Sequence, residues 1–264
     1  MGILNVTYDS FHRGSRYNTD IEILEAAGKM LKEGAGIIDV GGYSSRPGAG
    51  DVPQDEELRR VKKAVKLIKG EFPEAVISVD TFRSEVAKQA IADCGAHIVN
   101  DISGGEADNN MFKVVRELNV PYILMHMRGT PRTMQDNPVY DDVVAVILRW
   151  FGERIFRLQA EGVKDIIIDP GFGFAKDSVH NFEMLRRLGD FQIAGLPLLV
   201  GISRKTMIWR TLDITPDDAL NGTTALNMAA LLNGADILRV HDVKEAIETV
   251  RLFQEIATER PNTD

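Results

Sequence analysis

The sequence predicts a single (β/α)₈ barrel, and two observations lead to this prediction. Eight short apolar segments alternate with eight segments of helical periodicity over the 264 residues, which is the pattern of parallel strands joined by crossover helices. Several of the apolar segments end in a polar side chain, where barrel enzymes place their functional groups. A doubly wound open sheet shares the alternation, but the count of eight favours the barrel.

The expected elements follow one another without a linker, charge block or low-complexity segment, so one domain covers residues 1–264. The predicted strands are residues 1–6, 37–40, 76–80, 97–101, 122–126, 166–169, 198–201 and 237–240. The predicted helices are residues 21–33, 56–69, 84–93, 109–118, 141–161, 181–188, 216–233 and 243–256. A barrel strand that begins at the first residue is unusual, and we expect a short N-terminal extension before it.

The sixth predicted strand is the clearest. Residues 166–169 read Ile-Ile-Ile-Asp, a run typical of a strand buried on both faces of a parallel sheet. Pro170 and Gly171 then prevent the strand from continuing. An acid where a buried strand ends is costly unless it binds something. Asp169 is therefore predicted to contact a ligand.

Composition and charge narrow the class of protein. The chain is 44% hydrophobic and 27% charged, with a net charge of −8, which is ordinary for a soluble globular protein. Without a run of Lys and Arg, nucleic acid and anionic membrane surfaces are poor candidates for partners. The single Cys94 excludes an internal disulfide and suits a reducing compartment. Without a signal peptide or a long apolar stretch, we expect a cytoplasmic protein.

Carboxylates and carboxamides recur where the predicted strands end, and a cluster of such groups suits a flat heterocycle with N–H donors and acceptors. A carboxylate can accept two adjacent N–H groups, as it does from Arg. Asp80 and Asp169 end apolar strands with few local donors, so a ligand role is favoured for both. The polar strand ends are Asn5, Asp39, Asp80, Asn100 with Asp101, His126, Asp169, and Arg239 with His241.

A local structural role is the alternative at several of these positions. Asp39 and Asp101 precede glycine-rich turns, and capping of backbone N–H groups is favoured for both. His97 is expected to be a satisfied core or surface residue, whereas His126 could be structural or functional. The His and Cys residues lack metal-ligand spacing, so a structural zinc site is not expected.

Two groups of cations near the last two strands predict an anion site. Residues 201–206 place Ser203, Arg204 and Lys205 between strand seven and a helix start, a region that often binds phosphate in barrels. Arg239 and His241 follow strand eight. A surface position is the alternative, and it fits Arg204 better than the others. In an acidic protein, such a cluster is typical of a polyphosphate site.

Nine motifs, in order along nearly the whole chain, resemble the dihydropteroate synthase family. They are residues 1–7, 39–42, 45–48, 77–81, 100–105, 125–131, 169–174, 201–205 and 239–245. The resemblance implies a (β/α)₈ fold and a transferase of folate biosynthesis, in which p-aminobenzoate displaces pyrophosphate from 6-hydroxymethyl-7,8-dihydropterin diphosphate. It also implies sulfonamide binding and a homodimer.

The resemblance implies roles for individual residues. The pterin would be bound by Asp80, Asn100, Asp169 and Lys205, with Met125, Phe174 and Gly201 around it. The diphosphate would lie near Asn5, Arg46, Arg239 and His241, with Mg²⁺ bound partly by Asn5. The p-aminobenzoate site would comprise Phe11, Ser44, Ser45, Pro47, Lys205 and Thr206. Lys205, Arg239, His241 and Asn5 would be the catalytic residues.

The chain departs from the family's usual pattern at Tyr8, Arg13, Tyr43, Ser45 and Ala175. Arg13 replaces an acid in the first loop, Tyr43 replaces a glutamate, and Ala175 replaces a glycine with little expected effect. Two rival functions remain: a methyltetrahydrofolate-dependent corrinoid methyltransferase, and a pterin binder without turnover. The first would not need the cations after strands seven and eight, and the second would bind pterin without forming product.

Overall fold

The computed structural model describes residues 1–7, 19–43, 51–129 and 139–258, in which eight parallel strands form a closed barrel. Strands β1 to β6 form one sheet in sequence order, and β7 pairs with β8. Parallel bridges from Ile168 to Leu198 and from Gly2 to Val240 join these two sheets at both edges. The barrel prediction is therefore confirmed, and the open-sheet alternative is wrong.

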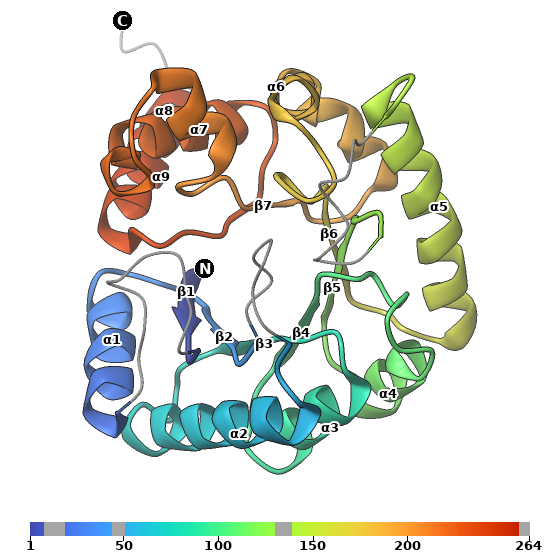
Figure 1. The fold of residues 1–264 in the computed structure, drawn as a ribbon, viewed down its shortest axis with the longest axis vertical. Helices are drawn as coiled ribbons and strands as arrows, with labels where there is room; N and C mark the ends of the chain where they lie inside the picture. Colours follow the sequence, from blue (N-terminus) through green and yellow to red (C-terminus); the bar gives the residue numbers. More distant parts are fainter. Residues whose placement is uncertain (8–18, 44–50, 130–138, 259–264) are drawn as a thin grey trace, which may run out of the picture.

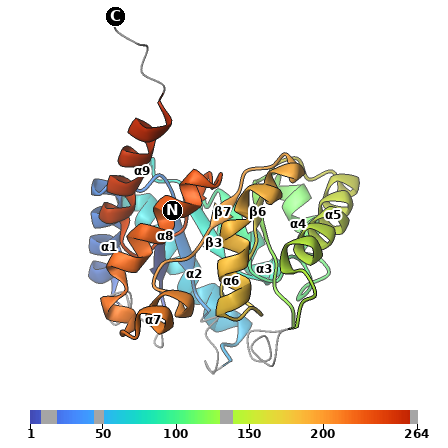
Figure 2. The same ribbon diagram turned by 90° about the horizontal axis from the view of Figure 1, so that it is seen from above.

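Helices surround the strands as a ring (Figure 1). The strands are β1 (Gly2–Asn5), β2 (Ile38–Gly41), β3 (Ile77–Asp80), β4 (Ile98–Asp101), β5 (Tyr122–Met125), β6 (Ile166–Asp169), β7 (Leu199–Val200) and β8 (Ile237–Leu238). The helices are α1 (Asp20–Lys32), α2 (Gln54–Glu71), α3 (Ser84–Ala92), α4 (Met111–Leu118), α5 (Val143–Glu161), α6 (Ser178–Arg186), α7 (Thr206–Leu212), α8 (Leu220–Leu232) and α9 (Val243–Ala257). Helices α1 and α9 lie on one flank and α5 on the opposite flank (Figure 2).

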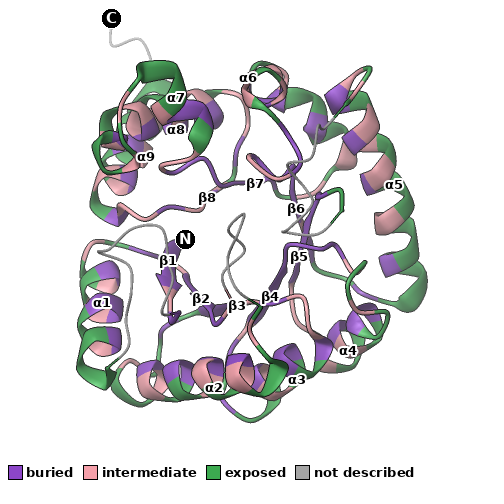
Figure 3. Ribbon diagram, viewed as in Figure 1, coloured by how far each residue is buried: buried purple, intermediate pink, exposed green. Residues whose placement is uncertain are grey.

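The main core lies between the strands and the helix ring, where each helix contributes one apolar face. Strand residues are mostly buried, and the helices are buried only along the side that contacts them (Figure 3). In α2, for example, Val61, Ala64, Val65 and Ile68 are fully buried, at the i, i+3, i+4, i+7 spacing of an amphipathic helix. This layer holds the ring against the barrel.

A second, smaller core fills the inside of the barrel near the strand starts. Its members come from seven different strands or the residues next to them, and side chains from opposite sides of a barrel can meet only inside it. They are Met1, Ile37, Ile98, Ile123, Ile167, Leu199 and Ile237. The barrel is therefore packed solid at this end, as barrels of eight strands are.

The predicted element boundaries agree with the structure except between β6 and β8. Helix α6 starts earlier than predicted, and a 3-10 helix, Leu188–Ala194, follows it. The predicted helix 216–233 is a 3-10 turn, Pro216–Asp218, followed by α8. Helix α7 was not predicted. Its seven residues are too few to show clear helical periodicity.

Ala175 lies in the connection from β6 to α6 with a left-handed φ of 52°. This conformation costs an L-residue about 1 to 2 kcal/mol, whereas glycine adopts it freely. The replacement of the family's usual glycine by Ala175 therefore introduces backbone strain, whereas little effect was expected from the sequence.

Ala175→Gly should raise the free energy of unfolding by up to about 1 kcal/mol, because relief of strain outweighs the extra chain entropy of glycine. Urea denaturation measures the change. As a matched control, Ala225→Gly in the exposed middle of α8 should lower stability by about 1 kcal/mol. Destabilisation by both variants would contradict the assigned strain.

Candidate active site

The predicted ligand residues lie near the strand ends, and the alternation of side chains along each strand turns them toward the inside of the barrel. Side chains alternate between the two faces of a strand, so positions two residues beyond the inner apolar core also point inward. From that core, two residues further along the chain are Asn100, Met125, Asp169, Gly201 and Arg239. Asn5 and Asp80 end β1 and β3 at the same end of the barrel. This end, where the strands finish, is the rim of the barrel.

Asn5 and Asp80 approach each other over Gly41, which lies between them on β2. Gly41 pairs with Asn5 on one side and Asp80 on the other. A Cβ at Gly41 would lie 3.2 Å from Asn5 Oδ1 and 3.6 Å from Asp80 Cβ. The absence of a side chain at Gly41 therefore lets a carboxamide and a carboxylate face the same space.

Arg239 connects two carboxylates across the barrel. Its Nε donates to Asp39 Oδ2 at 2.7 Å and its Nη2 donates to Asp80 Oδ2 at 2.7 Å. Asn100 Nδ2 donates to the same Asp39 oxygen at 3.0 Å. Asp39 is fully buried, whereas Asp80 keeps 15% of its side chain exposed. The buried Asp39 thus orients Arg239 and Asn100, whereas Asp80 remains partly open to a ligand.

The interpretation of Asp39 as a cap of the following glycine turn is wrong. Its Oδ2 atom accepts from Arg239 and Asn100, and its Oδ1 atom is buried without a hydrogen-bond partner. An acid at an inward position of a buried strand requires a partner, so the need for a partner could be predicted from the sequence, but not the identity of that partner. Its partner follows it by 200 residues in the chain.

The charges of this network shift one another's pKa values. Burial raises the pKa of Asp80 to about 7; Arg239 opposes this shift and Asp39 adds to it. Burial alone would lower the pKa of Arg239, but Asp39 and Asp80 together raise it above its ordinary value. Asp80 therefore changes charge near neutral pH.

Lys205, Asp169 and Phe174 form the neighbouring part of the rim. The ammonium of Lys205 lies 4.7 Å from the centroid of the Phe174 ring and donates to the carbonyl of Phe172. Burial lowers the pKa of Lys205 to about 8, with Asp169 opposing the shift. Burial also raises the pKa of Asp169, and Lys205 is the main group that lowers it. Each group thus opposes the shift that burial imposes on the pKa of the other.

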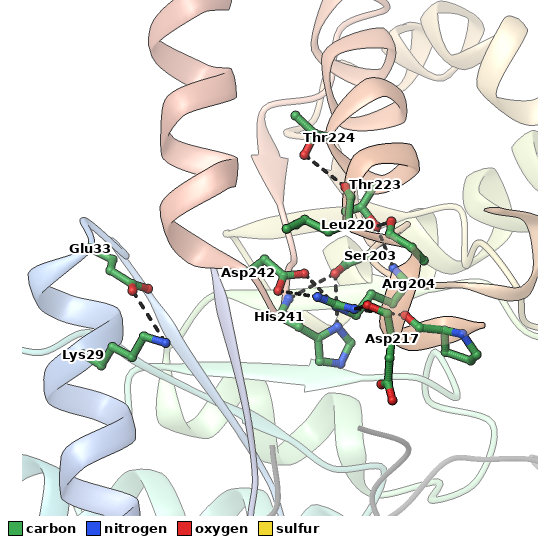
Figure 4. Close-up of polar contacts among 12 residues, drawn as sticks. Lys29, Glu33, Ser203, Arg204, Asp217, Leu220, Thr223, Thr224, His241 and Asp242 are labelled. Carbon is green, nitrogen blue, oxygen red and sulfur yellow. Dashed lines mark hydrogen bonds and ion pairs between the residues drawn. The ribbon is translucent and has the colours of Figure 1, made fainter. Parts of the chain in front are cut away.

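Ser203, Arg204, His241 and Asp242 join the connections after β7 and β8 (Figure 4). Ser203 Oγ lies 3.1 Å from His241 Nδ1. Arg204 donates from Nε and Nη2 to the two oxygens of Asp242, both at 2.8 Å, and its Nη1 donates to the carbonyls of Pro216 and Asp217. The surface alternative for Arg204 is wrong, because its side chain is only 10% exposed. Arg204 stabilises the loop that presents Lys205 and Ser203.

Several other polar residues have structural roles. Asp101 accepts from the backbone N–H groups of Ser103 and Gly105, at 2.7 and 2.9 Å, which confirms capping. It also accepts from the Tyr122 hydroxyl at 2.8 Å. His97 accepts from Ile77 N at 3.1 Å, as expected for a satisfied histidine. His126 is buried against Lys176, a residue that the sequence analysis did not select.

Five predicted site residues lie outside the described residues: Phe11, Ser44, Ser45, Arg46 and Pro47. The departures Tyr8 and Arg13 also lie there. Thr206 is described and is the exposed first residue of α7, next to Lys205. Within the part of the chain that the structure describes, three or more His, Cys, Asp or Glu side chains do not gather closely enough to hold a metal ion.

The described rim has two chemical halves. Asp80, Asn100 and Asp169 offer hydrogen-bond acceptors and donors, with the apolar groups of Met125 and Phe174 beside them. Arg239 and Lys205 offer positive charge close by. Such a set of groups can bind a flat polar ring through its edge and an anionic group attached to that ring.

Comparisons with known proteins agree with this reading. The family model described as pterin binding enzyme matches residues 1–241. The dihydropteroate synthase of Escherichia coli (strain K12) is 45% identical over 264 residues, which cover 99% of this chain and 93% of that protein.

Solved structures give the same result. A Yersinia pestis dihydropteroate synthase in complex with a sulfonamide drug superposes with a TM-score of 0.92 at 40% identity, covering 97% of this chain and 92% of that one. A Xanthomonas albilineans dihydropteroate synthase with 4-aminobenzoic acid gives 0.89 at 37% identity, covering 98% of this chain and 93% of that one.

Fold and rim together define an enzyme of the pterin-binding (β/α)₈ class. Within this class, the chain belongs to the dihydropteroate synthase family.

Arg239→Met should lower the free energy of unfolding at pH 8 by about 3 to 5 kcal/mol, because it leaves buried carboxylates without their counter-ion. With a pKa of about 7, Asp80 is largely protonated at pH 6 and loses less when Arg239 is removed. The penalty should therefore be smaller at pH 6 than at pH 8.

Urea denaturation at the two pH values measures both effects. Arg251→Met, at an exposed position of α9, serves as the control and should change stability by less than about 0.5 kcal/mol. An equal penalty for Arg239→Met at both pH values would contradict the pairing with Asp80.

Proposed function

We propose that this rim is where the chain condenses 6-hydroxymethyl-7,8-dihydropterin diphosphate with p-aminobenzoate to give 7,8-dihydropteroate and pyrophosphate. The observation that supports this site is the juxtaposition of Asp80, Asn100 and Asp169 with the cations Lys205 and Arg239 at one end of the barrel. One half suits the pterin ring and the other suits its diphosphate.

In this proposal the carboxylate of Asp169 accepts two adjacent N–H groups from the edge of the pterin, as a carboxylate does from Arg. Asp80 and Asn100 bind other donors and acceptors of the ring. Met125 and Phe174 cover its faces, and Gly201 adds no side chain beside Arg239 and Lys205, where a Cβ would lie 3.8 Å from Arg239 Cβ and 3.9 Å from Lys205 Nζ. The polar edges of the heterocycle thus gain partners among side chains that are mostly buried.

The diphosphate would lie between Asn5, Arg46, Arg239 and His241. Asn5 fits a role in Mg²⁺ binding, because a carboxamide oxygen is a hard ligand and Mg²⁺ commonly takes its other ligands from substrate phosphates and water. When bound, Mg²⁺ would neutralise part of the charge of the leaving pyrophosphate. Arg239, fixed by Asp39, would supply positive charge without reorganising.

The bond changes in this reaction are simple. The C–O bond to the diphosphate breaks, the C–N bond to the arylamine forms, and the amine nitrogen loses one proton. The electron-rich dihydropterin tolerates positive charge at the reacting carbon, and a neutral arylamine is already nucleophilic, so the step needs no strong general base. Lys205 and Thr206, with Phe11, Ser44, Ser45 and Pro47, would orient the p-aminobenzoate.

The rival functions explain the site less well. A corrinoid methyltransferase would use the pterin-binding groups but has no need for Arg239 and His241 beside them. A pterin binder without turnover accounts for the pterin-binding groups, Lys205 included, but not for Arg239 and His241 at the proposed diphosphate position.

We further propose that the protein is cytoplasmic and that it forms a homodimer, as expected from the sequence. No helix in the described ranges is long and apolar enough to cross a bilayer.

The proposed function is tested by measuring pyrophosphate release from the dihydropterin diphosphate with Mg²⁺, with and without p-aminobenzoate. We expect release that depends on p-aminobenzoate, is lost when EDTA removes Mg²⁺, and is matched by dihydropteroate formation. Pterin binding without release would favour the binder instead.

Lys205→Ala should lower kcat/KM in this assay by at least about 100-fold, the usual effect of losing a preorganised charge at a reacting centre. Lys113→Ala, at an exposed position of α4, is the matched control and should leave the rate unchanged.

A further inference from the structure

Lys176, in the connection between β6 and α6, has its amine group buried inside the protein, with only 2% of the residue exposed. Its Nζ atom lies 3.0 Å from His126 Nδ1, and it donates to the carbonyls of Gly171, Phe174 and His126 at 3.0, 2.8 and 3.3 Å. Three carbonyls can only accept hydrogen bonds. The amine therefore gives the carbonyls of His126 and Phe174 a buried donor, and it is a second donor for the Gly171 carbonyl, which also accepts from Phe174 N at 3.1 Å.

These contacts connect two parts of the rim. His126 directly follows β5, whereas Gly171 and Phe174 belong to the turn after β6. The turn has left-handed φ angles of 73° at Gly171 and 78° at Gly173, and a Cβ at Gly171 would overlap the carbonyl oxygen of His126. The backbone of the turn therefore lies directly against the end of β5, and the Lys176 amine is the side-chain group that bridges them.

The same turn holds groups of the proposed pterin site. Gly171 N donates to Asp169 Oδ1 at 2.7 Å, so the position of Gly171 orients the Asp169 carboxylate. Phe172 supplies the carbonyl that Lys205 contacts, and Phe174 supplies the ring over which Lys205 lies. Displacement of the turn would disturb Asp169 and Lys205 together.

We infer that Lys176 is a positioning residue for pterin binding: it fixes the turn after β6 so that Asp169 and Phe174 are placed for the heterocycle. This inference rests on the proposed function. Lys176 does not itself contact the substrate, because its amine is enclosed by His126, Gly171 and Phe174.

Electrostatics supports the same role. Burial lowers the pKa of Lys176 well below its ordinary value, and Asp169 is the main group that opposes this. In return, Lys176 is one of the groups that lower the pKa of Asp169, together with Lys205 and Arg239. The mutual effect on the two pKa values shows that Lys176 and Asp169 lie close enough to interact, in agreement with the geometry of the turn.

The test is the affinity for 6-hydroxymethylpterin, measured by calorimetry on the full chain. Lys176→Met keeps most of the side-chain volume but removes the N–H donors. We expect the Kd to rise by about 10- to 100-fold, since a displacement of roughly 1 Å in a positioned group has effects of this size.

A double-mutant cycle separates positioning from general destabilisation. Asp169→Asn alone should also weaken pterin binding, because a carboxamide cannot accept two donors from one edge. If Lys176 acts through Asp169, the double variant should bind only slightly more weakly than Asp169→Asn. Ile68→Ala, on the buried face of α2, destabilises the fold by cavity formation and should leave the Kd unchanged.

A wild-type Kd for folded Lys176→Met would overturn the inference, as would fully additive losses in the cycle. If Lys176→Met does not fold, His126→Phe tests the same contact, because it removes one acceptor and leaves the amine; it should raise the Kd by several-fold, and an unchanged Kd would overturn the inference. Failure of the wild-type chain to bind the pterin would instead contradict the proposed function.

Discussion

The active end of the barrel depends on one buried ion-pair network, in which Arg239 bridges Asp39 and Asp80. A guanidinium taken out of water is costly unless its donors are satisfied in good geometry. Here two N–H groups point at carboxylates from different strands, and Asn100 adds a further donor to Asp39. The network therefore forms only when β2, β3, β4 and β8 have closed into the barrel.

The closed barrel also separates packing from chemistry along its axis. One inward layer consists of apolar side chains near the strand starts, and the next inward layer toward the strand ends carries the polar side chains of Asn100, Asp169 and Arg239. A shift of one residue in any strand would exchange inward and outward side chains. The apolar layer thus fixes the register, and the register fixes which polar groups face the ligand. Residues that stabilise the barrel and residues that face the ligand are thus two positions apart on the same strands.

Much of this could be predicted from the sequence, because strand-end positions of a barrel converge whatever their distance along the chain. Asp80, Asn100, Asp169 and Arg239 were identified in this way. The role of Asp39 was not, because its partner Arg239 becomes a neighbour only when the barrel closes. Lys176 was missed because a lysine after a glycine-rich turn normally indicates a solvent-exposed loop, and its acceptors are backbone carbonyls without a sequence signal. The predicted contributions of Phe11, Ser44, Ser45, Arg46 and Pro47 stay predictions.

In the proposed function, Asp80 binds the pterin as a carboxylate while Arg239 holds it from the other side, and burial raises the pKa of Asp80 to about 7. The most direct test is the Kd for 6-hydroxymethylpterin between about pH 5.5 and about pH 7.5. Affinity should fall as the pH decreases through 7, by close to tenfold per pH unit at the acid end, since only ionised Asp80 accepts the ring's donors. Asp80→Asn should bind weakly and lose this dependence. A wild-type Kd that stays constant over the range would contradict the account.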